Sequence, residues 1–338
     1  MRNLPSASQE APGRLRTLDT VSGHGCLPAG PMRTMARMFD EGQAYAPVRT
    51  AVDGTVVVEL AGDHPGVSDP LYRQRRNEIA ALAVAWQEGD PVPDAAYTAE
   101  EHAVWRLVSG ELDLLHEVHA CQAFLEGKAA LRLPEERIPQ LSEVTAALEP
   151  LTGFRYAPAA GLVPLRAFYG SLADGQFFST QYIRHHSVPL YTPEPDVIHE
   201  VVGHANSLAA PRFAAIYRAA GRAARAAVSA EALEFVSKVF WFSLEFGVLR
   251  EGGSVKSYGA GLLSSYGEIQ QVGDARLVPL DLARMGTQTY DITHYQPLLF
   301  CAASFDEVED VVGGFFDEVG SAGDEVVHRL QRAHLSHA

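Results

Sequence analysis

Apolar residues recur at helical spacing over most of the chain after residue 70. The stretch 70–87 is amphipathic, and it opens with Asp69 and Pro70, a pair typical of an N-cap and a first helical turn. Pro139 marks a helix boundary because proline has no amide hydrogen to donate. The pattern predicts helices over residues 70–87, 98–128, 141–148, 197–206, 212–227 and 230–249, and two short helices within 305–334 that are broken at 313–314 and at 320–323.

β-structure is predicted in short pieces, over residues 55–60 and 176–183. The second piece lies in a stretch, 150–193, that is dense in glycine, proline and aromatic residues. The first 50 residues show no sustained periodicity. We therefore expect an irregular N-terminal arm over 1–58, one domain over 59–325 and a C-terminal tail over 326–338. The expected fold class is mainly α with a small antiparallel β component.

Charge and cysteine content narrow the function classes. The 42 acidic residues outnumber the 27 basic ones, giving a net charge of −15, which disfavours binding to nucleic acid or an anionic membrane surface. The sequence has neither a membrane-length apolar run nor the apolar core of a signal peptide, so we expect a cytoplasmic protein. Three scattered cysteines (Cys26, Cys121 and Cys301) argue against a disulfide framework and a cysteine-based zinc site.

A candidate metal site lies in the segment 192–204, where His199 and His204 stand five residues apart. Zinc proteases space their two histidines four apart, on one helix face. Five residues on an ideal α-helix place side chains about 140° apart, so both rings reach one ion only if the helix loosens. Gly203 lies where such loosening costs little.

Glu245 is the candidate third ligand. It is the one carboxylate in the apolar segment 235–249, which we expect to be a buried helix, and a buried carboxylate needs a partner. That partner is either a cation, such as Lys238, or a metal ion held with the two histidines. Two imidazoles and a carboxylate form the facial triad of non-haem Fe(II) enzymes, which leaves positions open for O₂ and a reductant. Zinc on the same ligands, with Glu200 as a hydrolytic base, is the alternative.

Long ordered stretches of the chain identify it as similar to the pterin-dependent aromatic amino acid hydroxylases, the family of phenylalanine, tyrosine and tryptophan hydroxylases. The likeness covers about residues 62–306. The stretches that carry it are DHPGVSDPLYRQRR (63–76), IPQL (138–141), QYIRHHSVPLYTPEPDVIHEVVGH (181–204), FWFSLEFGVLREG (240–252), SVKSYGAGLLSSYGE (254–268) and YQPLLFCAASF (295–305).

The resemblance implies a mostly helical catalytic domain with a deep pocket, and it implies a role for each matching residue. A guanidinium fork suits a carboxylate, so Arg184 as the substrate clamp and Asp196 as the acid that orients it make physical sense. The implied iron ligands are His199, His204 and Glu245; the other substrate contacts are Tyr191, Thr192, Trp241, Phe246, Gly261 and Ser264; the pterin site is Gly161, Val163 and Phe168, with Glu200 beside it as a catalytic residue.

The chain also departs from the family pattern. Phe178 stands where many members carry a histidine near the pterin, and Phe240 replaces a common tyrosine. The pterin loop 161–165 is looser than the usual motif. We find no counterpart of the N-terminal regulatory domain or of the C-terminal tetramerisation helix, and we therefore expect a monomer or a dimer.

Substrate choice follows from two positions. Tyrosine hydroxylases tend to carry an acidic residue where this chain has Ile292, and an aliphatic side chain cannot pair a buried substrate hydroxyl. Tryptophan hydroxylases tend to carry phenylalanine in place of Trp241, which leaves room for an indole. Phenylalanine, hydroxylated to tyrosine, is therefore the expected substrate. The alternatives are tryptophan, tyrosine or the meta position of phenylalanine.

The implied reaction is a mono-oxygenation that uses O₂, Fe(II) and a tetrahydropterin, either tetrahydrobiopterin or a bacterial analogue. The expected partners are thus small molecules: the amino acid, the pterin and O₂. Two other readings stay open at this point, namely a zinc hydrolase on the same ligands and a non-catalytic relative that binds amino acid or pterin.

Overall fold

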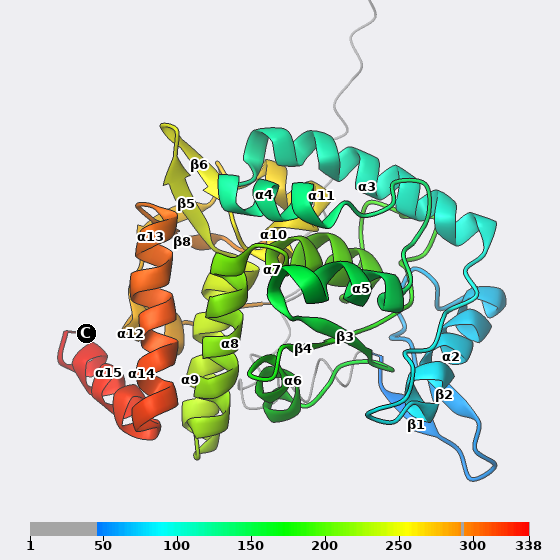
Figure 1. Ribbon diagram of the computed structural model, residues 1–338, viewed down its shortest axis with the longest axis horizontal. Helices are drawn as coiled ribbons and strands as arrows, with labels where there is room; N and C mark the ends of the chain where they lie inside the picture. The colour runs from blue at the N-terminus through cyan, green and yellow to red at the C-terminus, as the bar shows by residue number, and fades with distance from the viewer. Residues whose placement is uncertain (1–45, 292–293, 338) are drawn as a thin grey trace, which may run out of the picture. The chain divides into compact units, whose positions relative to one another are not determined.

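The computed structural model describes residues 46–291 and 294–337. Helices dominate this part of the chain, as predicted (Figure 1). The first set comprises α2 (Pro70–Ala85), α3 (Ala99–His119), α4 (Gln122–Leu131), α5 (Leu141–Thr152) and α6 (Leu165–Leu172). The later set comprises α7 (Asn206–Leu208), α8 (Pro211–Ala226), α9 (Ala230–Phe240), α10 (Ala260–Leu263), α11 (Tyr266–Gln270), α12 (Leu282–Thr287), α13 (Phe305–Glu307), α14 (Gly314–Ala322) and α15 (Asp324–His337).

Within residues 46–291 and 294–337, three segments are π-helical, each continuous with α-helix on at least one side. They are η2 (His199–Ala205), which runs into α7; η3 (Trp241–Glu245), which extends α9; and η4 (Val308–Gly313), which joins α13 to α14. The predicted helices over 197–206 and 230–249 therefore exist, with part of each wound as a π-helix.

In the part of the chain that the structure describes, the strands pair in three small sheets. β1 (Val48–Thr50) and β2 (Val56–Val58) form an antiparallel hairpin, and β3 (Arg155–Pro158) pairs in parallel with β4 (Gln176–Ser179). A four-stranded sheet has the order β6-β5-β8-β7, from β5 (Val248–Glu251), β6 (Ser254–Ser257), β7 (Arg276–Pro279) and β8 (Leu298–Ala302). Only its β5–β6 pair is antiparallel, so the β component mixes the expected antiparallel pairing with parallel pairing.

The core lies around α8 and α9, whose small and apolar residues are buried along most of their length. Helices α6 and α14 pack against α8, which lies beside α14 and α9 in Figure 1. Alanines at 214, 219, 220, 223 and 224 let these neighbours approach closely. None of the described helices combines the length and the apolar character that crossing a bilayer requires.

Two predicted helix boundaries are wrong. The helix expected over 98–128 is interrupted, because Ala120 forms a bridge with Ser257 and the Cys121 amide donates to the Ser257 carbonyl (3.0 Å). The break expected at Gly313-Gly314 is absent, since both glycines keep helical φ angles of −61° and −59° within the run from α13 to α14. Gly323, with a φ of +61°, does end α14.

The outer boundaries of the expected domain also differ from the structure. Residues 48–58, assigned to the irregular arm, contain the β1–β2 hairpin, which buries Val56 and Val58 against Ala80 of α2. In the expected tail, residues 326–337 belong to α15, and Val326 and Val327 lie in the main core. Apolar burial thus draws both segments into the packed structure. Cys26, in the expected arm, lies outside the described residues.

Candidate metal centre and adjoining cavity

The two predicted histidines and Glu245 converge on one point. The Nε2 atoms of His199 and His204 lie 3.1 Å apart, and the Glu245 carboxylate lies 3.2 Å from Nε2 of His204 and 3.8 Å from Nε2 of His199. Ligand atoms bound to one metal ion at about 2.1 Å lie about 3.0–3.4 Å from one another. The spacing therefore suits a shared metal ion.

The π-helix η2 explains how residues five apart face the same way. Its i→i+5 hydrogen bonds place His204 above His199, which an α-helix would not do. The loosening of the helix that the sequence predicts near Gly203 thus extends over the whole segment from His199 to His204. Gly203 is needed for close approach: a Cβ there would lie 2.7 Å from the Ala260 carbonyl oxygen.

Each histidine has its second ring nitrogen held by a hydroxyl group. Nδ1 of His199 lies 2.9 Å from Ser264 Oγ, and Nδ1 of His204 lies 2.8 Å from Tyr217 OH. Ser264 donates its own proton to the Ala260 carbonyl (2.8 Å), so its oxygen is free to accept from Nδ1–H of His199. That tautomer presents a lone pair on Nε2, as a metal ligand requires.

The electrostatics of the cluster favour a metal-binding protonation state. Burial, together with the neighbouring His204, lowers the pKa of His199 to about 4, so its ring is neutral near neutral pH. Burial alone would raise the pKa of Glu245, but His204 and His199 outweigh it and hold that pKa below its usual value. Lys238 pairs with Glu234 (2.8 Å), so it is not the partner of Glu245. A buried carboxylate facing two imidazoles is a donor set suited to a divalent cation.

The metal cluster lines a cavity of about 670 Å³. Fourteen of the fifteen predicted site residues line this cavity; Asp196, the exception, is fully buried and bonded to Arg184. The fourteen are Gly161, Val163, Phe168, Arg184, Tyr191, Thr192, His199, Glu200, His204, Trp241, Glu245, Phe246, Gly261 and Ser264.

Arg184 and Asp196 form a buried bidentate pair. Nε and Nη2 of Arg184 donate to the two carboxylate oxygens at 2.8 Å each, and the Arg184 amide donates to Oδ2 at 2.8 Å. The Arg184 charge lowers the pKa of Asp196 against the opposing effect of burial. The pair fixes the guanidinium, whose remaining N–H groups are then available to an anion in the cavity.

Aromatic rings form one wall of the cavity. Trp241, at the start of η3, stacks on Tyr290 with ring centroids 4.3 Å apart and packs on Phe246 at 4.5 Å. Gly261 closes this corner, because a Cβ there would lie 2.8 Å from the Phe246 ring and 2.9 Å from the Glu245 carbonyl oxygen. At the rim, Tyr191 is half exposed, and the Thr192 hydroxyl donates to the Glu194 carbonyl (2.7 Å).

The other side of the cavity holds the residues expected at the pterin. Phe168, in α6, packs edge-on against Phe177 (5.5 Å), and Phe178 also lines the cavity. Gly161 packs under the β1–β2 hairpin, with Val48 3.0 Å from where its Cβ would be. Burial and the nearby Glu245 charge raise the pKa of Glu200 well above its usual range, which favours the protonated form that can both donate and accept a hydrogen bond.

Several residues of the site were not found from the sequence. Tyr217 holds a ligand ring but lies 13 residues beyond His204 on another helix, where no spacing rule points to it. Glu268 of α11 and Tyr290 of the loop after α12 also line the cavity. Ile292, on which the substrate argument partly rests, lies outside the described residues.

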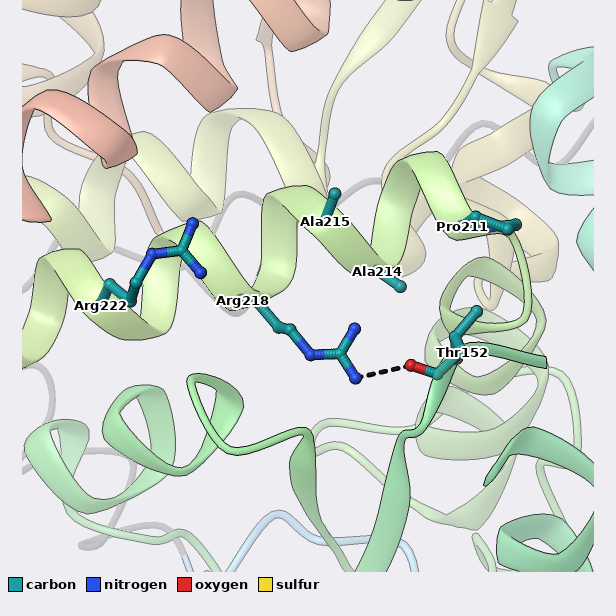
Figure 2. A pocket seen from close by; sticks show the side chains of 6 residues that line it. All are labelled: Thr152, Pro211, Ala214, Ala215, Arg218 and Arg222. Carbon is teal, nitrogen blue, oxygen red and sulfur yellow. Dashed lines mark hydrogen bonds between the residues drawn. The ribbon is translucent and has the colours of Figure 1, made fainter. Parts of the chain in front are cut away.

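A second hollow, of about 310 Å³, lies on the surface between α8 and the end of α5 (Figure 2). Arg218 crosses it and donates to the Thr152 carbonyl (2.6 Å), which satisfies an end group of α5. Neither a histidine nor a carboxylate lines this hollow. This hollow is therefore a packing contact between α8 and α5, and the residues suited to catalysis line the larger cavity.

Comparison with known proteins agrees with this site. Residues 53–321 match the model of the biopterin-dependent aromatic amino acid hydroxylases. The chain is 48% identical to phenylalanine 3-hydroxylase of Streptomyces coeruleorubidus over 76% of this chain and 92% of that protein. It is 43% identical to phenylalanine-4-hydroxylase of Bos taurus over 76% of this chain, and the match spans 58% of that longer relative.

Solved structures give the same result. The phenylalanine hydroxylase of Colwellia psychrerythraea 34H matches with a TM-score of 0.66 and 28% identity, covering 72% of this chain and 94% of that one. A structure of the Chromobacterium violaceum enzyme with bound iron(III) and 7,8-dihydrobiopterin matches with a TM-score of 0.61 and 30% identity, covering 65% and 82%. From its ligand cluster, its cavity and these matches, the chain belongs to the biopterin-dependent aromatic amino acid hydroxylase family.

Proposed function

We propose that this protein is an iron- and tetrahydropterin-dependent mono-oxygenase that hydroxylates the ring of free phenylalanine. The observation that carries the proposal is the cavity itself. It brings a two-histidine, one-glutamate cluster, a fixed arginine and an aromatic wall around one cavity of about 670 Å³.

The metal cluster fits Fe(II). His199 and His204 would ligate through Nε2, with their Nδ1 atoms held by Ser264 and Tyr217, and Glu245 would supply the anionic ligand. Such a set leaves coordination positions free. Bound iron and tetrahydropterin together supply the activation of O₂ and the electrons that ring hydroxylation needs. The protein residues set the geometry and keep the ligand atoms deprotonated.

The neighbouring half of the cavity fits a pterin. The Phe168 edge and the close-packed loop at Gly161 and Val163 offer an apolar slot for a flat heterocycle. Glu200, as a neutral acid, would pair with the donor and acceptor groups of such a ring. Phe178 contributes no polar group, so more of the pterin orientation depends on Glu200.

The substrate half fits an amino acid with one aromatic ring. Arg184, fixed by Asp196, would hold the α-carboxylate, and the stacked rings of Trp241 and Phe246 would orient the arene. The bulk of Trp241 leaves less room for an indole. We therefore assign phenylalanine as the substrate.

The ring position has two candidates. The family resemblance favours para-hydroxylation to tyrosine. Meta-hydroxylation is favoured by a specific observation: the Streptomyces relative, named a phenylalanine 3-hydroxylase, is 48% identical, whereas the vertebrate 4-hydroxylases are 41–43% identical. NMR identification of the product from phenylalanine, O₂ and tetrahydrobiopterin separates the two.

The central test is Glu245→Ala. We expect loss of bound iron and of phenylalanine hydroxylation, with far-UV circular dichroism unchanged. Glu234→Ala is the matched control, because it removes a carboxylate from α9 that pairs with Lys238. A Glu245→Ala protein with full iron content and normal turnover would contradict the assignment. Turnover without O₂ consumption would instead favour a zinc hydrolase.

Two finer assignments complete the proposal. We place the protein in the cytoplasm, in keeping with its acidic composition, and we assign it a monomeric or dimeric state. Cell fractionation tests the first, and light scattering on the purified chain tests the second.

A further inference from the structure

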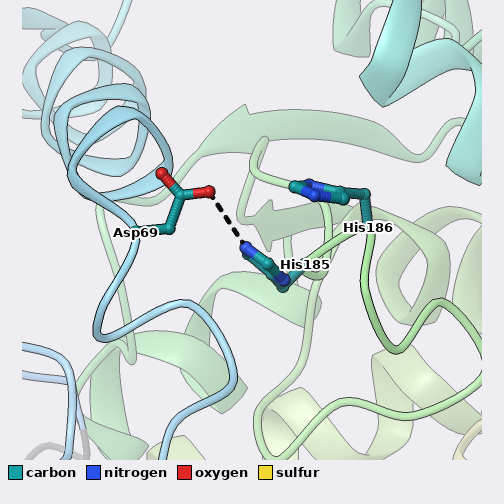
Figure 3. A group of neighbouring side chains, drawn as sticks. All are labelled: Asp69, His185 and His186. Carbon is teal, nitrogen blue, oxygen red and sulfur yellow. Dashed lines mark hydrogen bonds and ion pairs between the residues drawn. The ribbon is translucent and has the colours of Figure 1, made fainter.

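We propose that Asp69, His185 and His186 form a second metal site, separate from the catalytic one, that binds a divalent transition-metal ion such as Zn²⁺. Ligand atoms of the three residues lie within 4.8 Å of one another, and the residues come from the start of α2 and from the loop before Tyr191 (Figure 3). The proposal does not depend on the function proposed above.

Asp69 has one carboxylate oxygen to spare. Its Oδ1 accepts both N-cap hydrogen bonds, from the amides of Leu71 (2.8 Å) and Tyr72 (3.1 Å). Its Oδ2 makes only a long contact, 3.3 Å, with Nε2 of His185. That length is poor for a hydrogen bond, but it matches the separation of two ligand atoms on a tetrahedral Zn²⁺, about 3.4 Å.

His185 is held in place for ligation. Its side chain is 7% exposed, its ring packs edge-on against Tyr72 (4.9 Å), and its Nδ1 lies 2.7 Å from Ser187 Oγ. The Ser187 amide also donates to Nδ1 (3.3 Å), so without a metal the Nε2–H of His185 faces Asp69 Oδ2. A bound cation would displace that proton and take the Nε2 lone pair, as metal binding to histidine requires.

His186 completes the group from the solvent side. Its ring lies beside that of His185 (Figure 3). The two ring centroids are 4.3 Å apart, with an interplanar angle of 32°. The side chain is 42% exposed, so it can rotate inward by the small distance that coordination requires. Glu100, in the first turn of α3, lies 3.4 Å from Nδ1 of His186 and offers a fourth ligand. Two nitrogens and carboxylate oxygens suit Zn²⁺.

Zinc stoichiometry on the full chain tests the proposal. After equilibrium dialysis against micromolar Zn²⁺ without an affinity tag, we expect two zinc ions per wild-type chain and one per His186→Ala chain. Asp69→Asn is the sharper variant, since asparagine keeps the N-cap acceptor but loses the anionic ligand; it should also bind one ion. His119→Ala, which removes a histidine from the far end of α3, should bind two.

The catalytic centre can be removed independently. Glu245→Ala should retain one zinc ion, and Glu245→Ala combined with His186→Ala should retain none. Zn²⁺ should also raise the melting temperature of iron-loaded wild-type protein but not that of iron-loaded His186→Ala. Equal zinc content in wild type and His186→Ala, or a single wild-type ion that Glu245→Ala abolishes, would overturn the proposal.

Discussion

Arg184 shows how a single buried charge is made ready for a ligand. Its side chain is 2% exposed, and Asp196 is fully buried, so neither charge would be stable there alone. Together they satisfy each other through two 2.8 Å hydrogen bonds, and the pair costs little to keep in one orientation. The cavity thus receives a guanidinium whose orientation is set before any substrate arrives.

Replacing Arg184 with lysine tests this role. Lysine keeps the charge but cannot bond Asp196 and a substrate carboxylate with a planar fork. We expect the KM for phenylalanine to rise about 10- to 100-fold, corresponding to the loss of roughly 1.4–3 kcal/mol, with little change in the KM for tetrahydropterin. Steady-state kinetics with each substrate varied in turn give the answer. A change confined to the pterin KM would contradict the assignment.

Glu268 predicts a measurable pH dependence of stability. Its carboxyl group lines the cavity, and burial raises its pKa from 4.5 to about 7. The folded state therefore binds this proton more tightly than the unfolded state, and stability declines as the pH rises from about 4.5 to 7. In Glu268→Gln the residue no longer titrates.

Thermal denaturation from pH 5 to pH 8 measures the effect. The melting temperature of Glu268→Gln relative to wild type should increase with pH up to about 7 and then level off. Glu117→Gln, which changes an exposed carboxylate of α3, should show no such trend. If the difference in melting temperature between Glu268→Gln and wild type stays constant from pH 5 to pH 8, Glu268 is already ionised at pH 5 and the prediction is wrong.

At the scale of the element, the π-helical segments mark the limit of sequence analysis. The positions of His199, His204 and Glu245 could be predicted, because two histidines and one carboxylate in apolar segments demand a shared partner. The π-helical form of η2 and η3 could not be predicted. A π-helix and an α-helix can have the same apolar residues and differ only in which carbonyl each amide bonds to. Tyr217 was missed for a related reason: its contact with His204 depends on how α8 packs.

Gly203→Ala tests how tightly η2 is packed. The added Cβ would lie 2.7 Å from the Ala260 carbonyl oxygen. Because this oxygen belongs to the backbone, it can move away only if α10 shifts, and α10 leads directly to Ser264. We expect a loss of about 1–3 kcal/mol in unfolding free energy and a lower iron affinity. Chemical denaturation and iron titration measure both.

Gly110→Ala provides the matched control. Gly110 lies within α3, and nothing comes within 4 Å of an added Cβ. Alanine should there stabilise the protein by up to about 1 kcal/mol. Similar destabilisation by both substitutions would mean that close packing on Ala260 is not what requires glycine at 203.

At the scale of the whole molecule, the main helices follow from periodicity, whereas the edges of the domain do not. The β1–β2 hairpin has too few residues for a clear period, and the helix predicted after residue 323 carries no sign in the sequence that its start is buried. Their burial comes from partners distant in the chain: Val58 packs near Ala80, and the Asp324 carboxylate accepts from the amides of Val228 and Ser229 (2.8 and 2.9 Å). Only the tertiary structure reveals such pairings.

Truncation of α15 tests its contribution. A chain ending at residue 325 loses Val326 and Val327, which are 1% and 0% exposed. Burying a valine contributes about 1.5–3 kcal/mol, so we expect a loss of about 3–6 kcal/mol in unfolding free energy. A chain ending at residue 334, which loses Leu335 (77% exposed), should stay within about 0.5 kcal/mol of the full chain. Equal stabilities in urea denaturation would contradict the packing described here.

The five-residue spacing in η2 has a consequence for how such sites are encoded. Residues five apart in a π-helix occupy the relative positions that residues four apart occupy in an α-helix. Removing the codon for Val201 would leave His-Glu-Val-Gly-His, which is the HExxH pattern of the zinc proteases. A search of genomes by motif alone would therefore place this chain and its single-codon deletion in two unrelated enzyme classes. The two sequences differ by only one residue, which a π-helix accommodates and an α-helix does not.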